Sequence, residues 1–237
     1  MTWAVPRTLA AREVLRATAA LFQLSWPSCL PLALLGVLAS GAPGAEAVSS
    51  GEARGLSHSR EWWGLYLASM LLTLLCYGAV LLRQKALVQG VPLGAFDALR
   101  RSARVLPQAV ASALLYGVAA PLVLPLVYLS LAWTLAVWEG LSPLAACRRS
   151  IALVRGHALA LSGSYLATLA AVLVFVMLVG IFFGVIMTLA GQAGARAGVA
   201  ISRVLFAGLL SLPVVFVSAM LVSVCGALRA RLEPQPG

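Results

Sequence analysis

The sequence from Glu139 to His157 reads EGLSPLAACRRSIALVRGH. Ser142 is a typical N-cap, Pro143 suits the first position of a helix, and Gly156 suits the residue just past its end. At about 100° per residue, small and apolar side chains cover one half of this helix and arginines cover the other. The apolar half holds Leu144, Ala146, Cys147, Ser150, Ile151, Leu153 and Val154, and the polar half holds Arg148, Arg149 and Arg155. Because long apolar runs flank it, we predict a helix over 143–155 that lies along a membrane surface.

The composition of the whole chain is that of a multi-span membrane protein. Of its 237 residues, 62% are hydrophobic and only 10% are charged, whereas about 25% of the residues of a soluble domain are charged. The net charge of +10 raises the question of nucleic acid. The arginines, however, form short clusters beside apolar runs, as topology-setting residues and contacts with anionic lipid do. No stripe of arginine and aromatic residues indicates nucleic-acid binding.

The apolar runs predict an all-α polytopic protein with six transmembrane helices arranged as three hairpins. The spans are expected at about 17–39, 62–82, 107–120, 122–138, 158–190 and 200–228. Each hairpin is preceded by a basic amphipathic interfacial helix, at about 8–16, 92–106 and 143–155. The chain is therefore expected to be a single integral membrane domain.

The uncharged stretch from Pro107 to Trp138 has two readings. As one helix, its 32 residues would be about 48 Å long against a hydrocarbon core of about 30 Å. One crossing would also place the arginines before and after it on opposite sides, against the positive-inside rule. We therefore favour a hairpin that breaks near Ala120–Pro121 or Pro125, with one long helix as the alternative.

The distribution of basic residues predicts that both termini are cytoplasmic in a bacterial inner membrane. Thirteen of the 17 basic residues fall on the expected cytoplasmic side, and the other four are Arg54, Arg60, Arg196 and Arg203. A cleaved secretory signal is an alternative, because Ala45-Glu46-Ala47 matches the A-x-A cleavage pattern. The first apolar run is longer than the usual ~7–15 residues of a signal sequence, which argues against cleavage.

Two of the basic segments resemble each other. ALRRSARVL (residues 98–106) aligns with ACRRSIALV (residues 146–154), with identities at the alanine, both arginines and the serine. An internal duplication explains the match, because both copies precede an expected hairpin. Shared composition is the alternative, since alanine, leucine and arginine dominate the chain.

The pattern around the opening stretch resembles the YciC-like bacterial inner-membrane proteins, and also the membrane domain of some glycerophosphodiester phosphodiesterases. The matching residues are Glu139, Gly140, Ala146, Ser150, Leu153, Arg155 and Gly156. The resemblance implies six helices and no established activity. No phosphodiesterase sequence follows within the 237 residues, so that activity is not expected to carry over.

No catalytic, cofactor or metal site is predicted. The four cysteines are far apart without CxxC spacing, and no nucleotide-binding, hydrolase or metalloprotease motif is present. Glu139 has two readings: a cation or amine site, or an interfacial partner of Arg148, Arg149 or Arg155, which we favour. The candidate binding residues are Arg100, Arg101, Arg104, Arg148, Arg149 and Arg155, and the structural motif is Glu139, Gly140, Ser150 and Gly156.

These features favour a non-enzymatic membrane module that binds anionic lipid headgroups, or a membrane-protein partner, through its basic helices. A transporter or permease subunit is the alternative, because paired segments and intramembrane prolines are typical of carriers. Its spans, however, lack ionisable coupling residues. An enzyme acting on lipid is a third hypothesis, and it lacks a catalytic constellation.

Overall fold

The computed structural model of the chain describes residues 4, 6, 8–49, 60–119, 127–192 and 196–232. Regular structure in these residues is helical throughout, which confirms the all-α class. The helices are α1 (Ala11–Ser49), α2 (Arg60–Val88), α3 (Ala95–Ala119), α5 (Ala132–Glu139), α6 (Pro143–Val154), α7 (Ala158–Gln192) and α8 (Arg196–Leu232).

Four of the described helices are long and apolar enough to cross a membrane. These candidate spans are Ala11–Gly41 in α1, Arg60–Val88 in α2, Ala158–Leu189 in α7 and Val204–Arg231 in α8. They overlap the first, second, fifth and sixth predicted spans. Pro213 lies inside α8, which continues through it.

The six-span prediction is not confirmed, because neither of the two short spans expected between α2 and α6 is among the candidate spans of the described residues. The predicted surface helix 92–106 and span 107–120 belong to one continuous helix, α3, which runs through Pro107. In the second arm, 122–138, the described residues are helical at 127–129 and again in α5, which has 8 residues, about 12 Å of helix. The expected break between 120 and 126 lies outside the described residues. The predicted surface helix 8–16 likewise merges into α1 from Ala11 onward.

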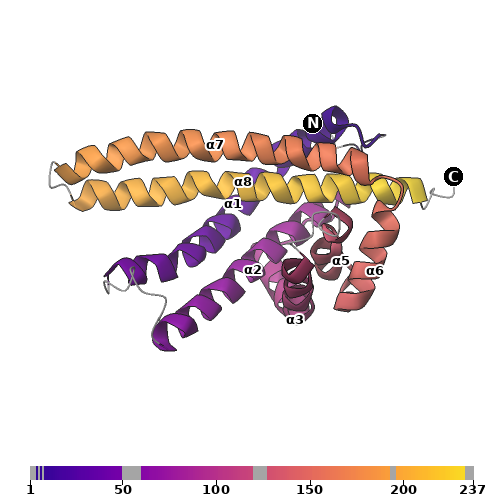
Figure 1. Cartoon of the computed structure of the whole chain (residues 1–237), viewed down its shortest axis with the longest axis horizontal. Coiled ribbons are helices and arrows are strands. Elements are labelled where there is room, and N and C mark those ends of the chain that lie inside the picture. Colours follow the sequence, from indigo (N-terminus) through magenta and orange to yellow (C-terminus); the bar gives the residue numbers. More distant parts are fainter. Residues whose placement is uncertain are drawn as a thin grey trace.

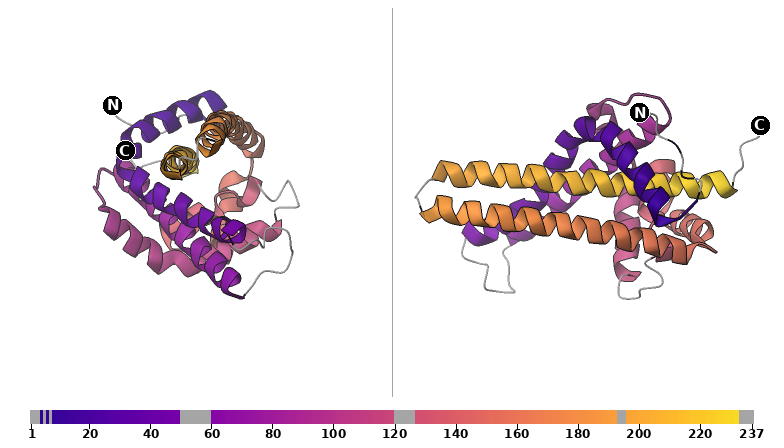
Figure 2. Two further views of the ribbon diagram at one scale, coloured as in Figure 1. Left: turned by 90° about the vertical axis from the view of Figure 1, so that its left-hand side faces the viewer. Right: turned by 90° about the horizontal axis from the view of Figure 1, so that it is seen from above.

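The long helices and the short ones have different directions. Helices α7 and α8 run side by side, and α1 packs on both α2 and α8 (Figure 1). Helix α3 is seen almost end-on in Figure 1 and lengthwise in the left panel of Figure 2, so it lies across the long axis of α7 and α8. Helix α6 also lies across this axis and contacts α3. We call α3 and α6 the crosswise helices.

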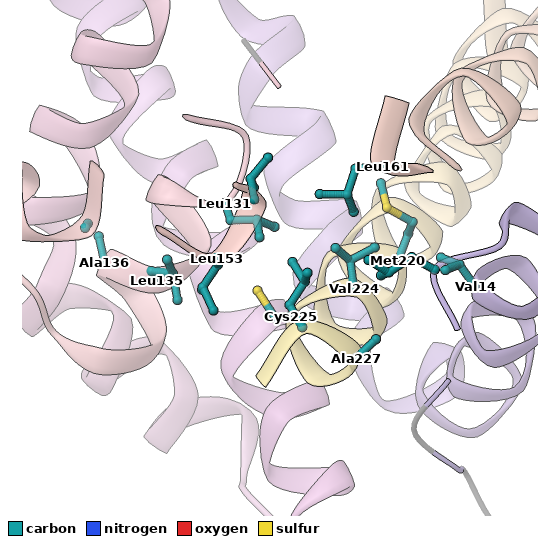
Figure 3. Packing of buried hydrophobic residues seen from close by; sticks show 14 residues of the cluster. Val14, Leu131, Leu135, Ala136, Leu153, Leu161, Met220, Val224, Cys225 and Ala227 are labelled. Atoms are coloured by element: carbon teal, nitrogen blue, oxygen red, sulfur yellow. The ribbon is translucent and has the colours of Figure 1, made fainter. Parts of the chain in front are cut away.

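The C-terminal part of α8 forms the centre of the core. Its residues Met220, Val224 and Cys225 lie between α1 on one side and the leucines of α5 and α6 on the other (Figure 3). Leu135 and Leu153 are fully buried in this cluster. The apolar side chains of the short helices therefore hold them against the bundle, while α7 stays largely uncovered.

Candidate functional site

The two crosswise helices bury equivalent residues. Ala98 of α3 and Ala146 of α6, aligned in the predicted repeat, are both fully buried. Ser102 and Ser150, four residues further along each helix, are buried as well. Residues four apart lie on the same face of a helix. Each helix thus contacts the rest of the molecule through the same small-residue stripe.

Both buried serines donate a hydrogen bond to a backbone carbonyl outside their own helix. Ser102 Oγ bonds to the Leu75 oxygen of α2 at 2.9 Å, and Ser150 Oγ bonds to the Tyr128 oxygen at 2.6 Å. Gly78 of α2 makes the first contact possible, because a Cβ there would overlap Ser102 Oγ. The serines fix how each crosswise helix sits on its neighbour and which face it leaves outside.

The outer faces carry the predicted binding residues. Five of the six arginines are exposed and the sixth, Arg149, is partly exposed; the exposed ones are Arg100, Arg101, Arg104, Arg148 and Arg155. Exposed apolar side chains lie beside them at aligned positions, with Phe96 at 77% exposure and Leu144 at 65%. Such a face, cationic with an adjoining bulky apolar residue, suits the interface of an anionic bilayer.

Only part of the apolar half predicted for α6 is buried against the protein. Ala146, Ser150, Leu153 and Val154 are buried, but Leu144 and Ile151 are exposed. They are seven residues apart and so share one flank of the helix. The helix has a protein-facing stripe and a separate exposed apolar stripe, where the sequence pattern showed a single wide one.

Glu139 lies at the end of α5 and forms its ion pair with Arg229 of α8. The expectation that it pairs with Arg148, Arg149 or Arg155 is therefore wrong. Arg229 lies near the C-terminal end of α5, where it also stacks over the Trp138 ring. The pair ties α5 to α8 and does not fix the bend into α6.

A small cluster that the sequence analysis missed surrounds Trp138. Lys85 Nζ of α2 donates to the Trp138 backbone oxygen at 2.6 Å, satisfying one of the free carbonyls at the end of α5. The Trp138 ring also lies 5.7 Å from Lys85 Nζ and 5.3 Å from the Arg229 guanidinium, within cation–π range. These side chains connect α2, α5 and α8 at one end of the bundle.

Gln84 forms a second contact that the sequence pattern did not reveal. It is fully buried, and its Nε2 donates to Ser25 Oγ at 3.2 Å and to the Val215 oxygen at 3.0 Å. Helices α1, α2 and α8 are joined by this one amide. It lies between Arg83 and Lys85, and nothing in the local sequence marks it as buried.

Both motif glycines have a positive φ, and Gly156 lies just past the end of α6, as the sequence predicted. Gly140 caps α5 with φ +64°, and Gly156 turns the chain from α6 into α7 with φ +85°. Only glycine adopts such angles without strain. Ser142 is the N-cap of α6 and Pro143 its first residue, although the Ser142 side chain makes no capping hydrogen bond.

The cysteines do not form a reactive or metal-binding group. Cys29, Cys76 and Cys225 are buried, and Cys147 on α6 is partly exposed. Burial raises the pKa of the Cys147 thiol, so little of it is thiolate at neutral pH. Within the described ranges, no three His, Cys, Asp or Glu side chains come together in a way that could hold a metal ion.

No protein-family model, curated protein or solved structure matches this chain, so the resemblance to the YciC-like proteins stays a prediction.

Proposed function

We propose that this protein is a membrane-embedded, non-enzymatic module that binds anionic lipid headgroups through α3 and α6. The observation that carries the proposal is the matched pattern of the crosswise helices. In both, a buried Ala/Ser stripe faces the bundle, while the other side carries an arginine pair, exposed except for the partly exposed Arg149, and an exposed large apolar side chain at the aligned position. No internal packing requires Phe96 or Leu144 to be exposed at aligned positions, and insertion into lipid explains both.

The proposed topology has four spans with α3 and α6 along one surface. An even number of crossings returns both termini to one side. The start of α1 and the ends of α2 and α8 carry basic residues, and these helix ends lie toward the same half of the bundle as α6 (Figure 1). The positive-inside rule makes this the cytoplasmic side of a bacterial inner membrane. This topology replaces the three hairpins because α3 is one crosswise helix and α5 is too short to span.

The strength of the expected preference for anionic lipid follows from the number of arginines. Each arginine near an anionic leaflet contributes about 1 kcal/mol of attraction, equivalent to a factor of about five in binding. Several exposed arginines on two adjoining helices therefore produce a clear preference for anionic over zwitterionic lipid. The preference falls with added salt, because exposed charges are screened.

The test uses the full chain reconstituted in vesicles that contain spin-labelled phosphatidylglycerol or phosphatidylcholine. The fraction of each lipid immobilised at the protein gives the headgroup preference. The test variant changes the six candidate arginines (Arg100, Arg101, Arg104, Arg148, Arg149, Arg155) to Gln, and the control changes Arg54, Arg60, Arg196 and Arg203 to Gln. We expect the first to lose most of the phosphatidylglycerol preference and the second to keep it. Equal losses would refute the proposal.

A further inference from the structure

A cavity of about 650 Å³ lies between α2, α3, α7, α8 and the segment before α5. Its wall is mainly leucine, valine and aromatic side chains, including Leu74, Leu169 and Val217. This volume is within the range of about 300–1,000 Å³ found for pockets that hold small ligands. The apolar wall selects hydrocarbon, since a polar or charged occupant would leave its groups without partners.

One side of the cavity carries hydroxyl groups. Ser130 Oγ and Tyr165 OH, both on residues of the wall, are hydrogen-bonded to each other at 2.8 Å. Two further wall residues have buried polar atoms, Thr168 Oγ1 and Trp133 Nε1, that no described group pairs with. Both atoms have almost no accessible surface, so an occupant of the cavity does not reach them. The hydrogen-bonded pair of Ser130 and Tyr165 makes this side of the wall more polar than the rest, which suits the ester region of a lipid.

The position of the hydroxyl groups along α7 matches the depth of a lipid ester. Arg155 lies just before α7, which begins at Ala158. From Ala158 to Tyr165 the helix rises about 10 Å, and the cavity wall continues to Val172, about 10 Å further. From the surface inward the order is guanidinium, hydroxyl, then apolar wall. A phospholipid presents phosphate, ester and acyl chain in the same order.

The segment before α5 links the arginine helix to the cavity. Tyr128 accepts the hydrogen bond from Ser150 of α6, and Ser130, two residues later, bonds to Tyr165 of α7. Charge at this end is also complementary to an anion. From α5 through α7 the single acidic residue is Glu139, and Arg229 already neutralises it. Arg148 and Arg155 remain exposed.

From these observations we infer that the cavity holds one acyl chain of an anionic phospholipid whose phosphate lies at Arg155. The inference rests on the proposed function and makes it specific: one lipid is bound at a defined place, in addition to the general headgroup attraction. The chain enters between α2 and α7 and the ester lies beside Ser130 and Tyr165.

Native mass spectrometry of the purified full chain tests this with added phosphatidylglycerol and with phosphatidylcholine of the same chains. The unmodified protein is expected to retain one phosphatidylglycerol. Ala113→Phe fills the cavity from α3, and Ala170→Phe places the same bulk on the exposed side of α7 as its control. Arg155→Gln removes the proposed phosphate contact, and Arg60→Gln removes an exposed arginine at the start of α2.

We expect Ala113→Phe and Arg155→Gln each to weaken the single-lipid adduct about tenfold, equivalent to about 1.4 kcal/mol, while both controls retain it. Equal retention in Ala113→Phe and Ala170→Phe would overturn the cavity assignment, and equal retention in Arg155→Gln and Arg60→Gln would overturn the phosphate assignment. The spin-label preference of the unmodified protein separates the two proposals. The preference for phosphatidylglycerol is present if only the cavity inference fails. It is absent if the proposed function fails.

A fluorescence measurement guards against a misfolded Ala113→Phe variant. Phosphatidylglycerol brominated along its chains quenches nearby tryptophan, and Trp133 is in the cavity wall. The quenching is expected to decrease on Trp133→Phe and to stay the same on Trp63→Phe corrected for the lost emission. The same quenching before and after Trp133→Phe would contradict the inference.

Discussion

Helices α3 and α6 start alike and end differently. Both bury an alanine and a serine at aligned positions, and both carry an aligned arginine pair and an aligned exposed apolar residue, Phe96 or Leu144. Helix α6 stops after 12 residues and turns into α7 at Gly156. Helix α3 continues for 25 residues through Pro107. The same pattern of residues thus begins two different structures: α6 leads directly into the long helix α7, and α3 continues as one longer helix.

The difference shows which local features end such a helix. The position in α3 that aligns with Gly156 is Gln108, which cannot adopt φ +85° without strain. Pro107 does not end α3, although a proline removes one hydrogen bond to the carbonyl four residues earlier. That residue, Ala103, is exposed, so its carbonyl is able to bond to water or a headgroup. The difference in length between α6 and α3 therefore depends more on the glycine at the end of α6 than on the proline in α3.

The largest loss of stability is expected from Gly78→Ala, which disrupts the contact between α3 and α2. The new Cβ would overlap Ser102 Oγ, so the serine must give up its bond to Leu75 or the two helices must separate. Overpacking of this kind costs about 1–3 kcal/mol. Thermal unfolding followed by a thiol-reactive dye reports the change, because Cys29, Cys76 and Cys225 are buried. Gly64→Ala on the same helix, with open space around it, should leave the transition unchanged or raise it slightly.

Ser102→Ala and Ser150→Ala test whether the two helices are seated equivalently. Each removes one hydrogen bond to a neighbouring carbonyl, and we expect each to lower the free energy of unfolding by about 0.5–1.5 kcal/mol. Ser162→Ala is the matched control, because its hydroxyl bonds to Ala158 in its own helix. If only one of the two serine substitutions were strongly destabilising, α3 and α6 would not be held by equivalent contacts.

Gly156→Ala sharpens the comparison at the point where the helices diverge. Nothing crowds this glycine, so the cost comes from the backbone at φ +85° and should be about 1–2 kcal/mol. Gly163→Ala, inside α7 and also uncrowded, should instead stabilise by about 0.5–1 kcal/mol. The two variants are compared by unfolding with SDS in mixed micelles. A shift of the unfolding midpoint in the same direction for both variants would contradict the assigned turn.

Glu139→Gln should have the smallest effect. The ion pair with Arg229 is partly exposed, at 26% for the Glu139 side chain and 31% for that of Arg229. Pairs this exposed contribute about 0–1 kcal/mol. We expect a small loss of stability that disappears in high salt. A loss above about 2 kcal/mol would mean that the Trp138 cluster carries more of the contact between α5 and α8 than the exposure suggests.

Patterns within a single helix were predictable from the sequence. Residues 158–190 and 200–228 are strongly apolar on average, so the existence of α7 and α8 followed from hydropathy. The end of α6 also followed, because Gly156 marked it in the sequence, and its φ is positive. The burial of Ala146 and Ser150 agrees with the face assigned from periodicity.

Contacts between distant helices were not predictable in the same way. The prediction assigned the charged segment 92–106 and the uncharged run that begins at Pro107 to separate helices, but α3 continues through Pro107. The partner of Glu139 depends on α8, 90 residues further along the chain. Gln84 is buried only because Ser25 and Val215 converge on it from two other helices. No local pattern contains this information.

The most direct test of the account is whether the arginine faces of α3 and α6 lie on one side of the membrane. In a chain whose native cysteines are replaced, Arg100→Cys and Arg148→Cys are labelled with a membrane-impermeant maleimide, and Arg60→Cys serves as the reference for the other end of α2. We predict that the first two are protected in intact spheroplasts and labelled in inverted vesicles, and that the reference shows the reverse. Labelling of the first two from opposite compartments would contradict the account.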